Sequence, residues 1–262
     1  MKRSIPFLVT IALAFIFAAC DSGADAPPSD DITPVPFEAK AGFFSRYDQY
    51  AVDTSDASGN NPDKLIQPKV TLIETVDAVG LTFAGRTGVS RHISTPEGGG
   101  NPDTMYFSQD ANGDLYRYNY GFSILNNFPD LEVAIGQRVD MGWVLVARLG
   151  KKEGAAWIAK DSSLPVQFLS GKSVFFKSSA RMLADTSIMV GDSLILCRAA
   201  EHVITAKATI ASTDDVKGEV RARTYISGKY GKVVFDFIRS GKFEGIYQGK
   251  FRGLYKIMTF HE

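Results

Sequence analysis

The chain is poor in the residue types that build catalytic and metal sites. Its 262 residues include two cysteines and three histidines, and 29 basic residues balance 29 acidic ones, so there is no net charge. The sequence contains no G-x-S-x-G or H-E-x-x-H motif, and no histidine has the spacing of a metal ligand or triad member. We therefore expect a protein that is not an enzyme and that has no cofactor and no metal site.

Cysteine is too scarce to build a disulfide framework. If Cys20 is modified, as argued below, Cys197 has no partner within the chain, and the body must be stable without a disulfide. Cys197 lies in the apolar run LILC, which favours a buried, unreactive thiol.

Long apolar runs are absent outside the first twenty residues. Lys2 and Arg3 precede the apolar run 5–17, and the small residues Ala18 and Ala19 follow it. This order is typical of a secretory signal peptide. The run is shorter than the ~20 residues that span a bilayer as a helix, so we interpret residues 1–19 as a signal peptide.

The end of this leader carries a recognisable motif. Phe17-Ala18-Ala19-Cys20 resembles the lipobox of bacterial lipoproteins. The resemblance implies that Cys20 becomes the acylated first residue of the mature protein, with fatty acids such as palmitate holding it in a membrane. The alternative is an ordinary signal peptide cut at an Ala-x-Ala-like site. Asp21 resembles an inner-membrane retention signal, but the choice between the inner and the outer membrane stays open.

Composition divides the rest of the chain into a tether and a body. Residues 20–37 are acidic and rich in proline and serine, which predicts a disordered acidic tether. Residues 38–262 are long enough for one domain or for two, with a sub-boundary near 150–154.

The body alternates apolar and polar residues and is rich in β-branched and aromatic side chains. This pattern predicts a mainly β fold: an antiparallel curved sheet, half-barrel or sandwich, or two packed β modules, with little helix after the signal peptide. Residues 194–208 also fit a short helix, but we favour a strand. The expected strands are 43–52, 70–79, 81–86, 104–108, 115–122, 143–149, 155–160, 166–169, 174–180, 194–200, 203–210, 220–226, 232–238 and 245–256.

The C-terminal part carries a second resemblance. TYISGKYGKVVFDF, with Tyr225, Gly231 and Val233, resembles the closing strands of uncharacterised β-rich envelope lipoproteins. The resemblance implies a β-rich fold and suggests no activity. His261 lies close to the chain end, which we expect to fray.

Asp110, Asn112 and Asp114 place oxygen atoms at alternate positions, as calcium-binding loops do. Leu115 and Gly121 stand where an EF-hand needs glycine and glutamate. Asn112-Gly113 between two apolar runs is instead a strong hairpin signal, so we favour a turn over a metal site.

The best candidate ligand surface is an aromatic stripe. Tyr116, Tyr118, Tyr120 and Phe122 recur at period two and share one face of the expected strand. Exposed, the stripe could stack on sugars or cover a lipid; a place in the core is the more favoured alternative.

These patterns predict a membrane-anchored lipoprotein of the bacterial cell envelope. We expect Cys20 to bind the lipid bilayer and the β body to bind another envelope protein or an apolar ligand. A structural or assembly component of the envelope is the alternative, and an enzyme whose site is not visible in the sequence comes third. Basic residues near the C-terminus are spread among apolar ones, so we expect no nucleic acid.

Overall fold

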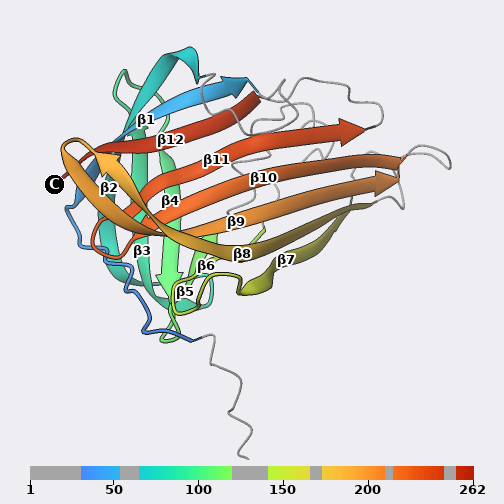
Figure 1. Cartoon of the computed structure of the whole chain (residues 1–262), viewed down its shortest axis with the longest axis horizontal. Helices are drawn as coiled ribbons and strands as arrows, with labels where there is room; N and C mark the ends of the chain where they lie inside the picture. Colours follow the sequence, from blue (N-terminus) through green and yellow to red (C-terminus); the bar gives the residue numbers. More distant parts are fainter. Residues whose placement is uncertain (1–30, 54–64, 120–140, 166–172, 210–214, 245–251) are drawn as a thin grey trace, which may run out of the picture. The chain divides into compact units, whose positions relative to one another are not determined.

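The computed structural model describes residues 31–53, 65–119, 141–165, 173–209, 215–244 and 252–262. In these residues the chain forms twelve strands and no helix (Figure 1), so none of them forms a helix that could cross a membrane. The strands are β1 (Phe44–Asp53), β2 (Leu65–Phe83), β3 (Arg86–Pro96), β4 (Asp103–Gln109), β5 (Asp114–Tyr118), β6 (Trp143–Arg148), β7 (Ala156–Pro165), β8 (Ser173–Val190), β9 (Ser193–Thr209), β10 (Asp215–Ser227), β11 (Gly231–Glu244) and β12 (Arg252–His261).

All twelve strands belong to one antiparallel sheet, in the order β6-β5-β4-β3-β2-β1-β12-β11-β10-β9-β8-β7. The sheet curls until β6 and β7 approach each other, and it is barrel-like and nearly closed (Figure 1). The Trp157 indole on β7 donates to the Leu145 carbonyl on β6 at 3.1 Å. The predicted antiparallel curved sheet is confirmed, and the strands on both sides of residues 150–154 belong to the same sheet.

Side chains alternate between the two faces of each strand, as the sequence pattern predicts. On β9, Ile195 and Cys197 are buried, whereas Leu194 and Leu196 are 67% and 65% exposed. This period of two confirms a strand rather than the alternative helix over 194–208. The thiol of Cys197 is buried as expected, and burial raises its pKa to about 12.

Strand β3 is the element that the sequence pattern misses. Its buried positions include Ser90, His92 and Ser94, so apolar and polar residues do not alternate along it. The expected strands 70–79 and 81–86 are instead one strand, β2, which ends at Phe83. A two-residue turn at Ala84 and Gly85 then leads into β3.

Two groups of buried apolar side chains stabilise the sheet. The larger one, the apolar core, comprises Met105, Phe107, Leu115, Met141, Val144, Val146, Ala147, Leu149, Ala159, Ala180, Met182, Ala200 and Ile226. The smaller one joins the end of the β8–β9 hairpin to β1, β11 and β12, and comprises Tyr47, Val190, Ile195, Cys197, Val233, Val234 and Met258.

Residues 32–38 form a strap that links two turns of the sheet (Figure 1, blue). The Ile32 amide donates to the Gly150 carbonyl at 2.9 Å, and the Glu38 amide donates to the Gly228 carbonyl at 3.1 Å. A Cβ atom on Gly228 would lie 2.6 Å from Val35 Cγ1, so this close approach requires glycine. Residues 31–37 were assigned to the tether from sequence; here they lie against the sheet.

Candidate functional site

A group of ionisable side chains is buried inside the sheet. This charged cluster consists of Glu74, His92, Lys232 and Lys256, each at most 5% exposed. Lys232 Nζ lies 2.6 Å from Oε1 of Glu74, and Lys256 Nζ lies 3.4 Å from Oε2. The Nδ1 atom of His92 lies 3.1 Å from Oε1 of Glu74. Because a buried charge is costly unless it is paired, the Glu74 carboxylate allows both ammonium groups to lie inside the protein.

Five consecutive strands of the sheet bring the charged cluster together. β3 and β2 carry His92 and Glu74, and β12 and β11 carry Lys256 and Lys232. Between these pairs, β1 contributes Tyr47, whose hydroxyl donates to the Lys232 carbonyl at 2.8 Å. The ammonium of Lys256 lies 4.5 Å from the centroid of the Tyr47 ring, which is a cation–π distance. The cluster therefore depends on long-range strand pairing.

The pKa values of the cluster reflect burial and pairing. Burial alone would raise the pKa of Glu74, but Lys232 and Lys256 outweigh it and hold this pKa well below its ordinary value. Burial lowers the pKa of Lys232 to about 8, against the opposing effect of Glu74. Burial also lowers the pKa of His92. The two lysines share one carboxylate. Two cations therefore stabilise the ionised form of Glu74, whereas half of one anion does not compensate the Lys232 ammonium for its lost hydration.

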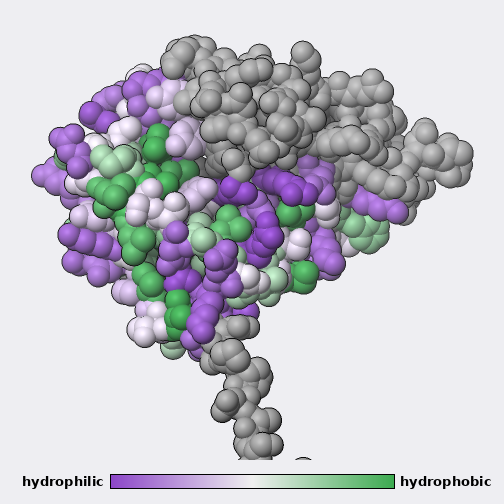
Figure 2. Space-filling model, viewed as in Figure 1, coloured by the Kyte–Doolittle hydropathy of each residue, from purple (hydrophilic) through white to green (hydrophobic). Residues whose placement is uncertain are grey.

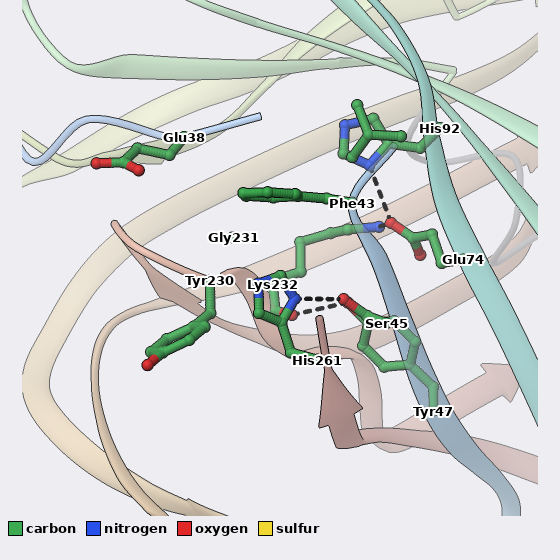
Figure 3. Close-up of a pocket in the computed structure, with 11 residues that line it drawn as sticks. Glu38, Phe43, Ser45, Tyr47, Glu74, His92, Tyr230, Gly231, Lys232 and His261 are labelled. Atoms are coloured by element: carbon green, nitrogen blue, oxygen red, sulfur yellow. Dashed lines mark hydrogen bonds and ion pairs between the residues drawn. The ribbon is translucent and has the colours of Figure 1, made fainter. Parts of the chain in front are cut away.

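A narrow cleft leads from the surface to the charged cluster (Figure 3). Glu74, His92 and the Lys232 ammonium lie together at one end of it, and Glu38 and Tyr230 lie at the other. The space is small, enough for a group of about the size of one water molecule. The lining residues are Glu38, Phe43, Ser45, Tyr47, Glu74, Val76, His92, Tyr230, Gly231, Lys232 and His261.

Polar and aromatic groups combine at the mouth of the cleft. The Ser45 hydroxyl lies 2.9 Å from Nδ1 of His261. The His261 ring packs edge-on against Phe43 and Tyr230, with centroid distances of 5.4 and 5.0 Å. The expectation that His261 lies in a frayed end is wrong, because its backbone pairs with Ser45 on β1.

The His92 ring is hydrogen-bonded at both of its nitrogens. The Nε2 atom of His92 lies 3.0 Å from the Ser90 hydroxyl, and Nδ1 faces Glu74, so both ring nitrogens are engaged. Lys232 pairs with Glu74 at 2.6 Å, and Lys256 shares the same carboxylate. Among the residues that the structure describes, no three His, Cys, Asp or Glu side chains lie close enough together to bind a metal ion.

The structure separates the residues of the predicted aromatic stripe from the charged cluster. Tyr116 and Tyr118 on β5 are partly exposed and alternate with Leu115 and Arg117, which are buried. The tyrosines thus lie on the outward face of the sheet, whereas the cluster lies on the inward face. Tyr120 and Phe122 lie outside the described residues, and so does Cys20.

The segment considered for calcium is a hairpin turn. The Asp110 carboxylate accepts the amides of Asn112 at 2.9 Å and Asp114 at 3.0 Å. The Gly113 amide donates to the Asp110 carbonyl, and Gln109 pairs with Leu115 across the hairpin. The predicted turn between β4 and β5 is confirmed.

Sequence reasoning missed Glu74, Lys232 and Lys256. A signal was present, because each is flanked two residues away on both sides by apolar or aromatic residues. Leu72 and Val76 flank Glu74, for example. In a strand such a position shares the apolar face, so it buries its charge. The sequence does not show that these three positions, one acidic and two basic, meet in the folded protein.

Comparison with known proteins finds two distant structural likenesses. No protein-family model matches the chain, and no curated protein matches it. A solved structure of a predicted lipoprotein from Parabacteroides distasonis is 12% identical, with a TM-score of 0.46 over 89% of this chain and 100% of that one. A predicted exported protein with a YMCC-like fold from Bacteroides fragilis is 11% identical, with a TM-score of 0.39 over 87% of this chain and 99% of that one.

Proposed function

We propose that the chain is a lipid-anchored, non-enzymatic binding protein of the bacterial cell envelope. The signal-peptide pattern of residues 1–19 and the lipobox-like residues that end at Cys20 support export and acylation. An acylated Cys20 would hold the β body at a membrane surface. The cleft that reaches Lys232 and Glu74 supports a binding role.

The ligand that we propose for the cleft is a neutral, hydroxylated group such as the end of a saccharide. One observation carries this proposal: the cleft reaches Lys232 and Glu74, which form an ion pair at 2.6 Å. Such a pair offers both a donor and an acceptor to a neutral hydroxyl group. The rings of Phe43 and Tyr230 provide apolar contact beside these polar groups. This ligand differs from the apolar one expected from the sequence.

A binding measurement tests the cleft. We expect saturation-transfer NMR to detect glucose, galactose or N-acetylglucosamine on the purified body. Lys232→Met removes the donor at the base of the cleft and weakens binding by about tenfold. Lys229→Met is the matched control, because Lys229 is exposed and is not one of the residues that line the cleft.

Tyr230→Ala provides a second variant, because Tyr230 is partly exposed and its loss leaves the charged cluster intact. It should also weaken the NMR signal. Absence of a signal for all three sugars, or equal binding by the Lys232 and Lys229 variants, would contradict the proposal for the cleft.

The anchor is tested separately in cells. Labelling with a fatty-acid analogue should mark the protein, and Cys20→Ser should abolish the label. Incorporation that survives Cys20→Ser would contradict the lipoprotein assignment and leave the ligand proposal untouched.

A structural or assembly role is the second candidate, and one observation favours it. Met189, Leu194 and Leu196 on the β8–β9 hairpin are 55%, 67% and 65% exposed. Over the coloured part of the face in Figure 2, hydrophobic residues are interspersed with hydrophilic ones. If Leu194→Ser and Leu196→Ser disrupt a complex with another envelope protein without changing sugar binding, the hairpin serves assembly.

A further inference from the structure

The outward face of β2 to β6 carries a second, separate group of interacting residues. Phe83 and Tyr106 stack at a centroid distance of 3.9 Å, and Tyr118 packs edge-on against Phe83 at 5.0 Å and against Trp143 at 5.4 Å. All four rings are partly exposed. Together with Tyr116 and Arg86 they form the aromatic surface, which contains the two described tyrosines of the predicted stripe.

A strained turn fixes one side of the aromatic surface. Ala84 and Gly85 connect β2 to β3 with φ values of 45° and 79°, a two-residue turn in which alanine adopts the left-handed region. The indole of Trp143 donates to the Ala84 carbonyl at 2.9 Å and so joins this turn to β6. The turn places Phe83 and Arg86 opposite each other and against the rings. Backbone strain of this kind persists where the surroundings hold it, and it is concentrated at functional sites.

Arg86 adds a positive charge to the rings. Its guanidinium carbon lies 3.4 Å from the centroid of Tyr116 and 5.6 Å from that of Trp143, which are stacking distances. Within the described residues Arg86 has ring contacts but no carboxylate partner, in contrast to Arg91, which pairs with Asp77. Stacking holds the guanidinium plane and leaves its N–H edge for a planar anion.

We infer that the aromatic surface binds an acidic saccharide through ring stacking and through a carboxylate on Arg86. The apolar face of a sugar ring packs against aromatic side chains, which supply large contact areas at a small entropy cost. A uronate adds a carboxylate that matches the fork of the guanidinium. This site is independent of the cleft, because it lies on the opposite face of the sheet and takes a charged ligand.

Fluorescence of Trp143 tests this inference directly. The chain has two tryptophans, so Trp157→Phe leaves Trp143 as the single reporter. We expect trigalacturonate to change the Trp143 emission in a saturable manner, and neutral maltotriose to bind about tenfold more weakly.

Substitutions at Arg86 test whether its guanidinium binds the carboxylate of the ligand. Arg86→Gln should weaken trigalacturonate binding by about tenfold, and Arg86→Lys should recover part of the loss, because lysine keeps the charge but not the planar fork. Arg221→Gln is the matched control: Arg221 is exposed on β10 and pairs with Glu219 at 3.0 Å. Circular dichroism confirms the fold of each variant.

Three results would overturn the inference. Trigalacturonate could leave the Trp143 emission unchanged up to millimolar concentration. Arg86→Gln and Arg221→Gln could weaken binding equally, which would indicate general charge attraction. Oligothymidylate could bind the same surface as tightly as trigalacturonate, which would replace the saccharide by nucleic acid. None of these results bears on the cleft, whose test uses neutral sugars and Lys232.

Discussion

The charged cluster and the apolar core lie inside the same sheet but are stabilised by different forces. The core gains from burying side chains such as Leu115 and Met182, which are at most 1% exposed. The charged cluster is buried to a similar degree, yet each of its charges loses solvation and depends on a partner. Phe107 joins the two regions, because it belongs to the core and its ring centroid lies 4.7 Å from Lys232 Nζ.

This difference indicates where the protein can bind a ligand. A packed core tolerates little change, and its side chains offer no polar group. The charged cluster is costly to bury, and the cleft reaches it directly. Ionisable groups with shifted pKa values beside a cleft are typical of binding and active sites. We therefore place the proposed ligand at Lys232 and Glu74 rather than in the core.

The largest effect should come from removing the carboxylate that the cluster shares. Glu74→Gln leaves Lys232 and Lys256 buried without their anion, and we expect unfolding in urea to show a loss of about 3–5 kcal/mol. Glu219→Gln is the control, because Glu219 pairs with Arg221 at the surface and should contribute at most ~1 kcal/mol. Equal losses in the two variants would show that the buried Glu74 carboxylate contributes no more to stability than a surface carboxylate.

A cavity in the apolar core should have a somewhat smaller effect of a different kind. Leu115 is fully buried, and Leu115→Ala should lower the free energy of unfolding by about 3 kcal/mol. Leu115→Met preserves the volume and should cost less than ~1.5 kcal/mol. Because no titration is involved, the loss in Leu115→Ala should be the same at acidic and alkaline pH. A loss that varies with pH would mean that core and cluster are coupled.

The pH dependence of stability separates the cluster from the core. The pKa of Lys232 is about 8 in the folded protein against 10.5 ordinarily, so between these values the unfolded chain binds more protons. The free energy of unfolding should therefore rise with pH in this window, by about 3 kcal/mol. Glu74 affects stability at acidic pH. Its pKa is lowered below 4.5, so the stabilisation by its ionised form is present above that pH and is lost on further acidification.

Urea unfolding at a series of pH values measures both windows. Lys232→Met should abolish the rise between pH 8 and 10.5, whereas Lys229→Met should preserve it, because Lys229 is exposed. A rise that survives in Lys232→Met belongs to another group and would contradict the assignment to Lys232.

The sequence predicted the fold well and the candidate site poorly, for one physical reason. Alternation identifies strands whose inward residues are apolar, as on β6 and at Ile195 and Cys197 of β9. It fails on β3, whose inward residues Ser90 and His92 are polar because they belong to the polar interior. The same failure hides Glu74 and Lys232, which lie 158 positions apart in the numbering and meet only through strand pairing. The tyrosine stripe was found because it repeats locally on one strand.

The smallest effect concerns the strap, which touches both regions. The Phe37 ring packs against His92 of the cluster and Phe107 of the core, with centroid distances of 6.2 and 5.4 Å. Gln109 holds this segment: its side chain accepts the Phe37 amide at 2.8 Å and donates to the Val35 carbonyl at 2.8 Å. Gln109→Ala should lower the free energy of unfolding by about 1 kcal/mol.

Hydrogen exchange at the Phe37 amide shows whether the strap is held as a unit. Gln109→Ala removes the acceptor of this amide, so its exchange should accelerate, while Gln49→Ala on β1 should leave it unchanged. The Glu38 amide donates to the Gly228 carbonyl near the cleft. If Gln109→Ala also accelerates exchange at this amide, the strap opens as one unit. Unchanged protection at Phe37 would mean that ring packing alone holds the strap, and that the two regions are joined by apolar contact.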